Sequence, residues 1–198
     1  MNNPVNAIDP NGKDIVFITK IGGKTTHFQY TVEGNLKNVN TGQIYDGSKI
    51  GGHLGDIVDG YNKMLNSGDE NYVNQITTLI KSKNVHEVDT REVAGSEVAP
   101  GSGIMSASEA LKKASNGEKV GTTTKFNFKK DIGIETTNYT TVAHEVQHQF
   151  DFDQGNMKDS INKDGKLITG NDSPAEQRAI KNEDFAREQE ELDKRRKY

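Results

Sequence analysis

The stretch TTVAHEVQHQFDFDQG, residues 140–155, contains two histidines four positions apart, and a glutamate directly follows the first of them. Residues four apart lie on one face of an α-helix, with their Cβ atoms about 6 Å apart. Val142, Val146 and Phe150 also repeat every four residues, which predicts an amphipathic helix over residues 139–153. The histidine pattern is HExxH, although a solvated polar helix can carry the same spacing.

The chemistry of zinc explains why these residue types occur at this spacing. Zn²⁺ binds imidazole nitrogens at about 2.0–2.1 Å, so His144 and His148 can chelate one ion without bending the backbone. Glu145 stands beside the first ligand, where a carboxylate can take a proton from an activated water and return it to a leaving amine. The motif therefore predicts a zinc site with Glu145 as general base, whereas a structural metal site has no need of that carboxylate.

A catalytic zinc site takes a third protein ligand and keeps one coordination position open. The continuation HExxHxxGxxH is not present, because Asp151 stands at the glycine position and Gln154 at the last histidine position. We favour Glu176, from the next helix, as the third ligand. Its alternative role is in a capping box, with Ser173 as N-cap and Pro174 at the first helical position.

Several other side chains are weaker candidates for the site. Glu183 is the second choice as third ligand, and Asp151 and Asp153 are either ligands, supporting groups or solvated residues at the end of a helix. We expect His27, His53 and His86 to be surface or structural residues, because they are scattered along the chain.

Composition excludes several classes of function. The 198 residues suffice for one domain, but only 31% are hydrophobic, which predicts a thin core. The net charge of −4 gives no basic field for nucleic-acid binding. The absence of cysteine excludes disulfides and thiolate metal sites. No apolar run approaches the length of a membrane span, so we expect no membrane insertion, and the N-terminal residues do not form a signal peptide.

The rest of the pattern predicts an α+β domain with a small antiparallel sheet. The expected elements are a hairpin (residues 14–20 and 26–32, around Gly22-Gly23), short strands (43–45, 85–88 and 123–129), helices (54–66, 70–82, 106–114 and one from 173) and loops (93–103 and 155–171). We expect a substrate to lie extended along an edge strand, with residues 123–128 as the candidate.

The order of motifs resembles a known family. HEVQH, then SPAEQRAIKNEDFAREQEE, then a final Arg-x-x-Tyr, is similar to the NleD-type effector zinc metallopeptidases over roughly the last third of the chain. The resemblance implies a zincin-like fold, a zinc ion on His144, His148 and Glu176, and Glu145 as catalytic base. It also implies that Tyr198 donates a hydrogen bond to the oxyanion and that Arg195 orients Tyr198. The alternative is that the last residues, DKRRKY, form a solvated basic tail. The Glu-Asn pair usual in the family is inverted here to Asn182-Glu183.

The first residues resemble a second kind of sequence. NNPVNAIDPNG looks like the junction after Rhs-repeat cores, which implies a linker over residues 1–12 and a C-terminal toxin domain over residues 13–198. Such a domain is delivered into a target cell as part of a larger secreted polypeptide, acts on a protein there, and has a cognate immunity protein. The alternative is a flexible N-terminal turn.

Three functional hypotheses follow from the sequence. The first is a zinc-dependent endopeptidase that acts as a secreted toxin or effector. The second is a non-catalytic toxin or adaptor domain that binds its target, with a structural metal or none. The third is a metal-dependent hydrolase that acts on a non-peptide bond.

Overall fold

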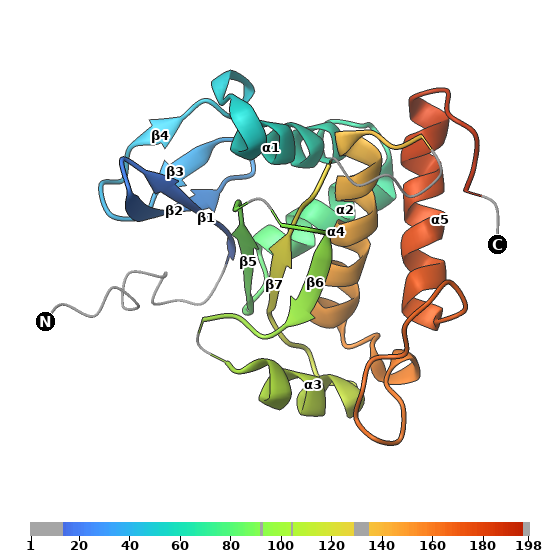
Figure 1. Ribbon diagram of the computed structural model, residues 1–198. Coiled ribbons are helices and arrows are strands. Elements are labelled where there is room, and N and C mark those ends of the chain that lie inside the picture. The colour runs from blue at the N-terminus through green and yellow to red at the C-terminus, as the bar shows by residue number, and fades with distance from the viewer. Residues whose placement is uncertain (1–13, 92, 104, 129–134, 196–198) are drawn as a thin grey trace, which may run out of the picture.

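The computed structural model describes residues 14–91, 93–103, 105–128 and 135–195, which form a mixed α/β structure (Figure 1). Within these residues there are seven strands: β1 (Asp14–Ile21), β2 (Lys24–Tyr30), β3 (Leu36–Asn38), β4 (Ile44–Tyr45), β5 (Val85–Asp89), β6 (Glu97–Pro100) and β7 (Thr122–Lys125). There are five α-helices: α1 (Gly52–Leu65), α2 (Glu70–Ile80), α3 (Ala107–Ser115), α4 (Asn138–Gln154) and α5 (Pro174–Gln189). The predicted junction over residues 1–12 lies outside the described residues.

The strands form one mixed sheet in the order β4-β3-β2-β1-β5-β7-β6. The predicted hairpin is confirmed: β1 and β2 pair antiparallel around Gly22 and Gly23, whose φ angles of 56° and 79° suit glycine. The prediction of a small antiparallel sheet is wrong, because β5 pairs parallel with both β1 and β7. The long crossovers between these strands contain helices, and a parallel pair requires such a crossover.

The far end of the sheet differs from the prediction in a way that bears on the site. Residues 93–103, expected to be a loop, contain β6, which pairs antiparallel with β7 and forms the sheet edge. Strand β7 ends at Lys125 and lies between β5 and β6. Residues 123–128 are therefore not an edge strand, and the edge nearest α4 is β6 (Figure 1).

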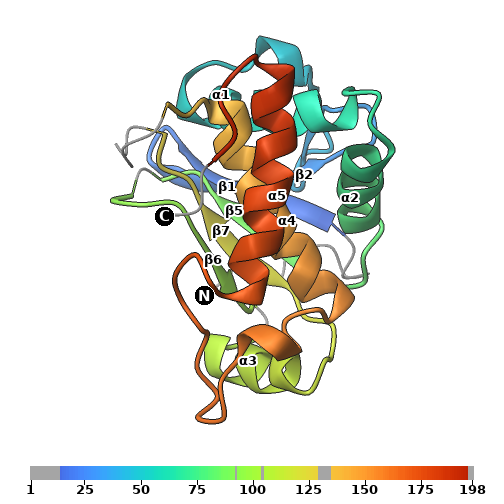
Figure 2. The ribbon, with the colours of Figure 1, turned by 90° about the vertical axis from the view of Figure 1, so that its right-hand side faces the viewer.

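Helices α1, α2 and α4 pack together beside the sheet, and α5 packs on the outer side of α4 (Figure 2). The main core lies between these helices and the strands, and aromatic rings fill its centre: Phe17 and Tyr61 meet at 5.5 Å between ring centroids. Among the described residues no helix is both long and apolar enough to cross a membrane.

A second, smaller core lies at the lower end of α4 in Figure 1. It joins helix α3 to the segment between α4 and α5, and contains Ala110, Ala114, Val120, Phe152, Met157, Ile161 and Ala175. Because Ala175 belongs to the first turn of α5, this core fixes where α5 begins and therefore where its first acidic residue, Glu176, is presented.

Candidate metal centre

Helix α4 carries the HExxH motif on the side that faces α5. Thr137 caps the helix by accepting a hydrogen bond from the backbone of Thr140, and the Thr140 hydroxyl accepts one in return. Gly155 ends the helix with a φ of 75°. Val142 and Val146 are fully buried in the main core, so His144 and His148 lie on a different face and remain partly accessible.

At the start of α5, the backbone of Glu176 takes part in the N-cap, and its side chain lies near the histidines. The Ser173 hydroxyl accepts a hydrogen bond from the Glu176 backbone N–H, and Pro174 opens the helix, as predicted. The Ser173 backbone N–H donates to the carbonyl of Gly170 rather than to a glutamate side chain. The Glu176 backbone therefore completes the N-cap while its carboxylate faces the two histidines.

The three ligand-type side chains converge at a spacing that suits a metal ion. Glu176 Oε1 lies 3.3 Å from His144 Nε2, and Glu176 Oε2 lies 3.4 Å from His148 Nε2. A tetrahedral ion with bonds of about 2.0–2.1 Å separates neighbouring ligand atoms by about 3.3–3.4 Å, whereas a direct charge-assisted hydrogen bond is about 2.7–2.9 Å. One ligand atom from each residue lies within 4.8 Å of the other two. This cluster could hold a metal ion.

A second glutamate of α5, Glu183, contacts the ring nitrogen of His144 that points away from the cluster. The Nδ1 atom of His144 lies 3.1 Å from Glu183 Oε2, and Glu183 is buried. A hydrogen bond at Nδ1 fixes the ring orientation and leaves Nε2 for a metal. Glu183, the second choice as third ligand, therefore contacts the wrong nitrogen to share the cluster, and it acts on the site through His144.

Two arginines hold Glu183 in place, and one of them is a predicted site residue. Arg195 Nη1 donates to Glu183 Oε2 at 2.9 Å and lies 4.0 Å from Glu176 Oε1. Arg187, which is buried, contributes a weaker contact of 3.4 Å to Glu183 Oε1. Arg195 thus lines the same pocket as His144 and Glu176, and its side chain is 17% exposed. Tyr198 lies outside the described residues.

The electrostatics of the metal-free site follow from this geometry. Burial alone would lower the pKa of His144, but the carboxylates of Glu176 and Glu183 outweigh it and raise the pKa to about 10. Burial likewise opposes the charge of Glu176, yet its contacts with His144 and His148 lower its pKa. A proton on His144 and the charge on Glu176 thus stabilise each other where a cation would otherwise lie.

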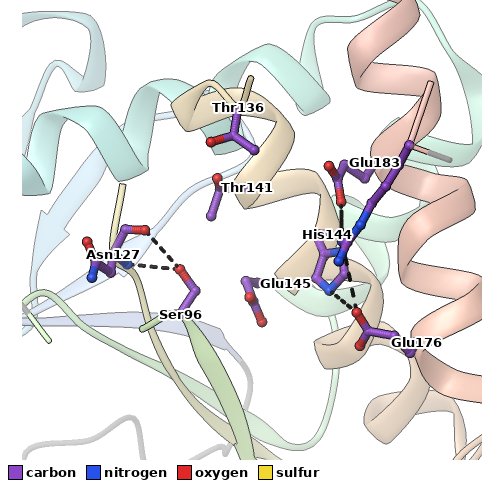
Figure 3. A pocket seen from close by; sticks show the side chains of 9 residues that line it. Ser96, Asn127, Thr136, Thr141, His144, Glu145, Glu176 and Glu183 are labelled. Atoms are coloured by element: carbon purple, nitrogen blue, oxygen red, sulfur yellow. Dashed lines mark hydrogen bonds and ion pairs between the residues drawn. The ribbon is translucent and has the colours of Figure 1, made fainter. Parts of the chain in front are cut away.

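Glu145 lies in the same pocket, beside the cluster that could hold a metal ion. Its carboxylate lines the same pocket as His144 and Glu176, and it points into the space between His144 and Ser96 (Figure 3). Burial raises its pKa, and the nearby histidines only partly oppose that shift. A carboxyl group with a raised pKa beside a metal cluster is suited to proton transfer near neutral pH.

The two aspartates after the motif take no part in the cluster. Asp151 is fully buried and pairs with Arg178 of α5 at 2.8 Å. Asp153 is buried in a separate network, where it accepts hydrogen bonds from Asn84 at 3.0 Å and contacts His86 Nε2 at 3.2 Å. Both are structural partners of neighbouring elements, which excludes them as ligands of this cluster.

The other histidines lie away from the cluster, as expected. His86 is fully buried on β5 and is a structural residue. His53, on α1, packs against Phe128 with 5.3 Å between ring centroids. His27 lies on β2 in the hairpin.

Sequence reasoning did not find the opposite wall of the pocket. Ser96 and Asn127 line the pocket opposite His144 and Glu176, and Thr136 and Thr141 line it between the two sides (Figure 3). Only Thr141 offered a signal, because it lies three residues before His144 on the same helix face. The other three come from segments whose meeting depends on the sheet order.

Comparisons of the chain with protein-family models, with curated proteins and with solved structures found no match.

Proposed function

We propose that this protein is a zinc-dependent endopeptidase with a zincin-like active site that acts as a toxin or effector on a protein of a target cell. The observation that carries the proposal is the spacing of His144 Nε2, His148 Nε2 and the Glu176 carboxylate, together with Glu145 in the same pocket. Two imidazoles and one carboxylate with an open fourth position are a donor set typical of catalytic zinc.

The residues of the site supply the proton chemistry of peptide hydrolysis. A zinc ion bound by His144, His148 and Glu176 would supply Lewis acidity and favour ionisation of water near neutral pH. Glu145 accepts the proton of the attacking water and returns it to the leaving amine. Glu183 keeps the Nε2 atom of His144 directed at the ligand cluster, and Arg195 holds Glu183.

The substrate in this proposal lies along β6 and not along residues 123–128. Strand β6 pairs with β7 on one side, and no described strand pairs with its other side. An extended peptide can add to such an edge through backbone hydrogen bonds. Because β6 lies beside α4 (Figure 1), that peptide would cross the pocket next to Glu145.

The remaining parts of the proposal rest on the motif resemblance. Tyr198, with Arg195 at its side, would donate a hydrogen bond to the oxyanion. The chain would reach its target cell as the C-terminal part of a larger secreted polypeptide, and a cognate immunity protein would protect the producing cell. Neither nucleic acid nor membrane insertion has a place in this mechanism.

The decisive variant is Glu145→Gln. We expect it to lower the rate of peptide cleavage by about 10²–10⁴-fold, because it removes the proton acceptor and keeps the side-chain shape. Metal analysis should still find one zinc ion per chain, because Glu145 is not among the ligands. Glu188→Gln, an exposed residue of α5, is the matched control and should retain activity. Toxicity that persists in the Glu145→Gln variant would instead support a non-catalytic binding domain.

A further inference from the structure

The pocket extends beyond the metal cluster on one side, and that side has its own chemistry. Its volume is about 140 Å³, and one water needs only about 10–15 Å³ of such volume, so a substrate side chain fits beside the attacking water. His144, Glu176 and Glu183 line one side, Ser96 and Asn127 lie opposite, and Thr136 and Thr141 lie between the two sides (Figure 3). The polar wall formed by Ser96, Asn127, Thr136 and Thr141 thus consists of three hydroxyl residues and one amide residue, with no large apolar side chain.

The hydroxyl hydrogens of Ser96 and Thr141 are used within the protein. Ser96 Oγ donates to the carbonyl of Asn127 at 3.4 Å and accepts from the Asn127 backbone N–H at 2.9 Å. Thr141 Oγ1 donates to the carbonyl of Thr137 at 3.0 Å. A hydroxyl oxygen has two acceptor sites, so Ser96 keeps one of them and Thr141 keeps both. At Ser96 and Thr141, the wall therefore offers acceptors to a substrate side chain.

The charges around the pocket favour neither an acidic nor a basic substrate side chain. Three carboxylates line it, those of Glu145, Glu176 and Glu183, together with the guanidinium of Arg195. A divalent ion and one guanidinium balance three carboxylates. A buried guest with its own charge would therefore lose hydration without gaining a counter-charge, which is costly.

We propose that this wall is a specificity site that accepts a small, neutral, hydrogen-bond-donating side chain of the substrate, namely Asn, Gln, Ser or Thr, next to the scissile bond. The inference rests on the proposed peptidase function. Ser96 directly precedes β6, so a peptide paired along that edge brings the side chain beside its scissile bond to this wall. Large aliphatic and aromatic side chains are disfavoured there, because they would leave the acceptors of the wall buried and unpaired. Charged side chains are disfavoured because they would lose hydration without gaining a counter-charge.

The test uses the zinc-loaded full chain and a library of peptides of mixed sequence, with cleavage sites read by mass spectrometry. We expect Asn, Gln, Ser and Thr together to be enriched at one position flanking the cut. In the double variant Thr136→Val/Thr141→Val, the kcat/KM ratio for a peptide with Gln over the same peptide with Leu at that position should fall by about tenfold or more. Thr25→Val, an exposed residue of β2, is the control and should leave the ratio unchanged. Equal melting temperatures of the variants confirm that the fold is kept.

The possible failures are distinguishable. Cleavage that depends on Glu145 but prefers aromatic, aliphatic or charged residues at both flanking positions overturns the specificity site and leaves the peptidase in place. A ratio that does not change in the double variant also overturns it. Absence of any cleavage beyond that of Glu145→Gln overturns the proposed function, and the specificity site with it.

Discussion

In the proposed site, a proton and a metal ion would compete for a single side chain, that of His144. Its two ring nitrogens each face a carboxylate, Glu183 at Nδ1 and Glu176 at Nε2. These contacts raise the pKa of His144 to about 10 in the metal-free chain, against the effect of burial. Only the neutral imidazole binds a metal, so a metal ion must displace this proton.

Zinc binding should therefore release about one proton at pH 8, where His144 is protonated in the metal-free chain and neutral in the bound one. Isothermal titration calorimetry in buffers with different protonation enthalpies measures that number directly. The apparent affinity for zinc should fall as the pH falls below about 10, because the proton competes increasingly well. Binding enthalpies that are equal in all buffers at pH 8 would contradict this prediction.

Asp153 contributes to the stability of the fold, and this contribution depends on pH. Burial alone would raise its pKa, but hydrogen bonds from His86, Ser82 and Asn84 lower it from 3.8 to about 2. A carboxyl group with a depressed pKa in the folded chain stabilises the fold above pH 3.8, and this stabilisation is lost as the pH falls towards 2. We expect a loss of about 1–2 kcal/mol over that interval, after allowance for solvent screening. Urea unfolding of the zinc-free protein and of Asp153→Asn should show a shallower acid slope in the variant; parallel curves would exclude the effect.

At the level of elements, the site depends on how α5 lies against α4. Arg178, two residues after Glu176, joins the two helices. Its Nε donates to the buried Asp151 at 2.8 Å, and its Nη1 donates to Asp159 at 2.9 Å. Glu176 thus has its position fixed from both sides, by the N-cap at Ser173 and by this arginine.

Arg178→Met should lower the free energy of unfolding by about 2–3 kcal/mol, because it leaves the carboxylate of Asp151 buried without its partner. It should also weaken zinc binding by up to about tenfold, since the support of a ligand-bearing turn is lost. Denaturant unfolding and competition with a chromophoric chelator measure the two effects. Lys181→Met, an exposed change on the same helix, is the control, and an equal effect of both variants would show that Arg178 has no special role.

The elements also show what the sequence could and could not predict. All five helices follow from apolar periodicity and capping residues, and HExxH singled out His144 and His148, which meet Glu176 in one cluster, and Glu145, which lines the same pocket as His144. Strand β6 was missed because Gly and Pro around Glu97–Pro100 resemble a loop. The parallel pairing of β5 was missed because periodicity indicates which face of a strand is buried, not the direction of its neighbour. Glu183 and Glu176 lie seven residues apart, two turns on one helix face, and that spacing was the available signal for their shared site.

On the scale of the whole molecule, α5 buries fewer large apolar side chains than α1, α2 or α4. Its buried residues are small or charged apart from Ile180: they are Ala175, Ala179, Ile180, Glu183, Ala186 and Arg187. Helix α4, by contrast, buries Val142, Val146 and Phe152 in the two cores. Polar contacts also cross from α4 to α5, and three of them join His144 or His148 to Glu176 or Glu183.

A metal ion that binds both helices should consequently stabilise the whole fold. A ligand at about a thousand times its Kd adds about 4 kcal/mol, and about 1 kcal/mol raises the melting temperature of a domain of this size by about 2–4 °C. Removal of zinc by a chelator should thus lower the melting temperature by roughly 10 °C, as calorimetry would show. His148→Ala, which removes one ligand, should melt lower from the start and respond little to the chelator. The two apolar cores are present in the metal-free chain, so the transition should shift without disappearing. An unchanged melting temperature after verified removal of zinc would show that the apolar cores alone hold α5 in place, and the metal would then have no structural role.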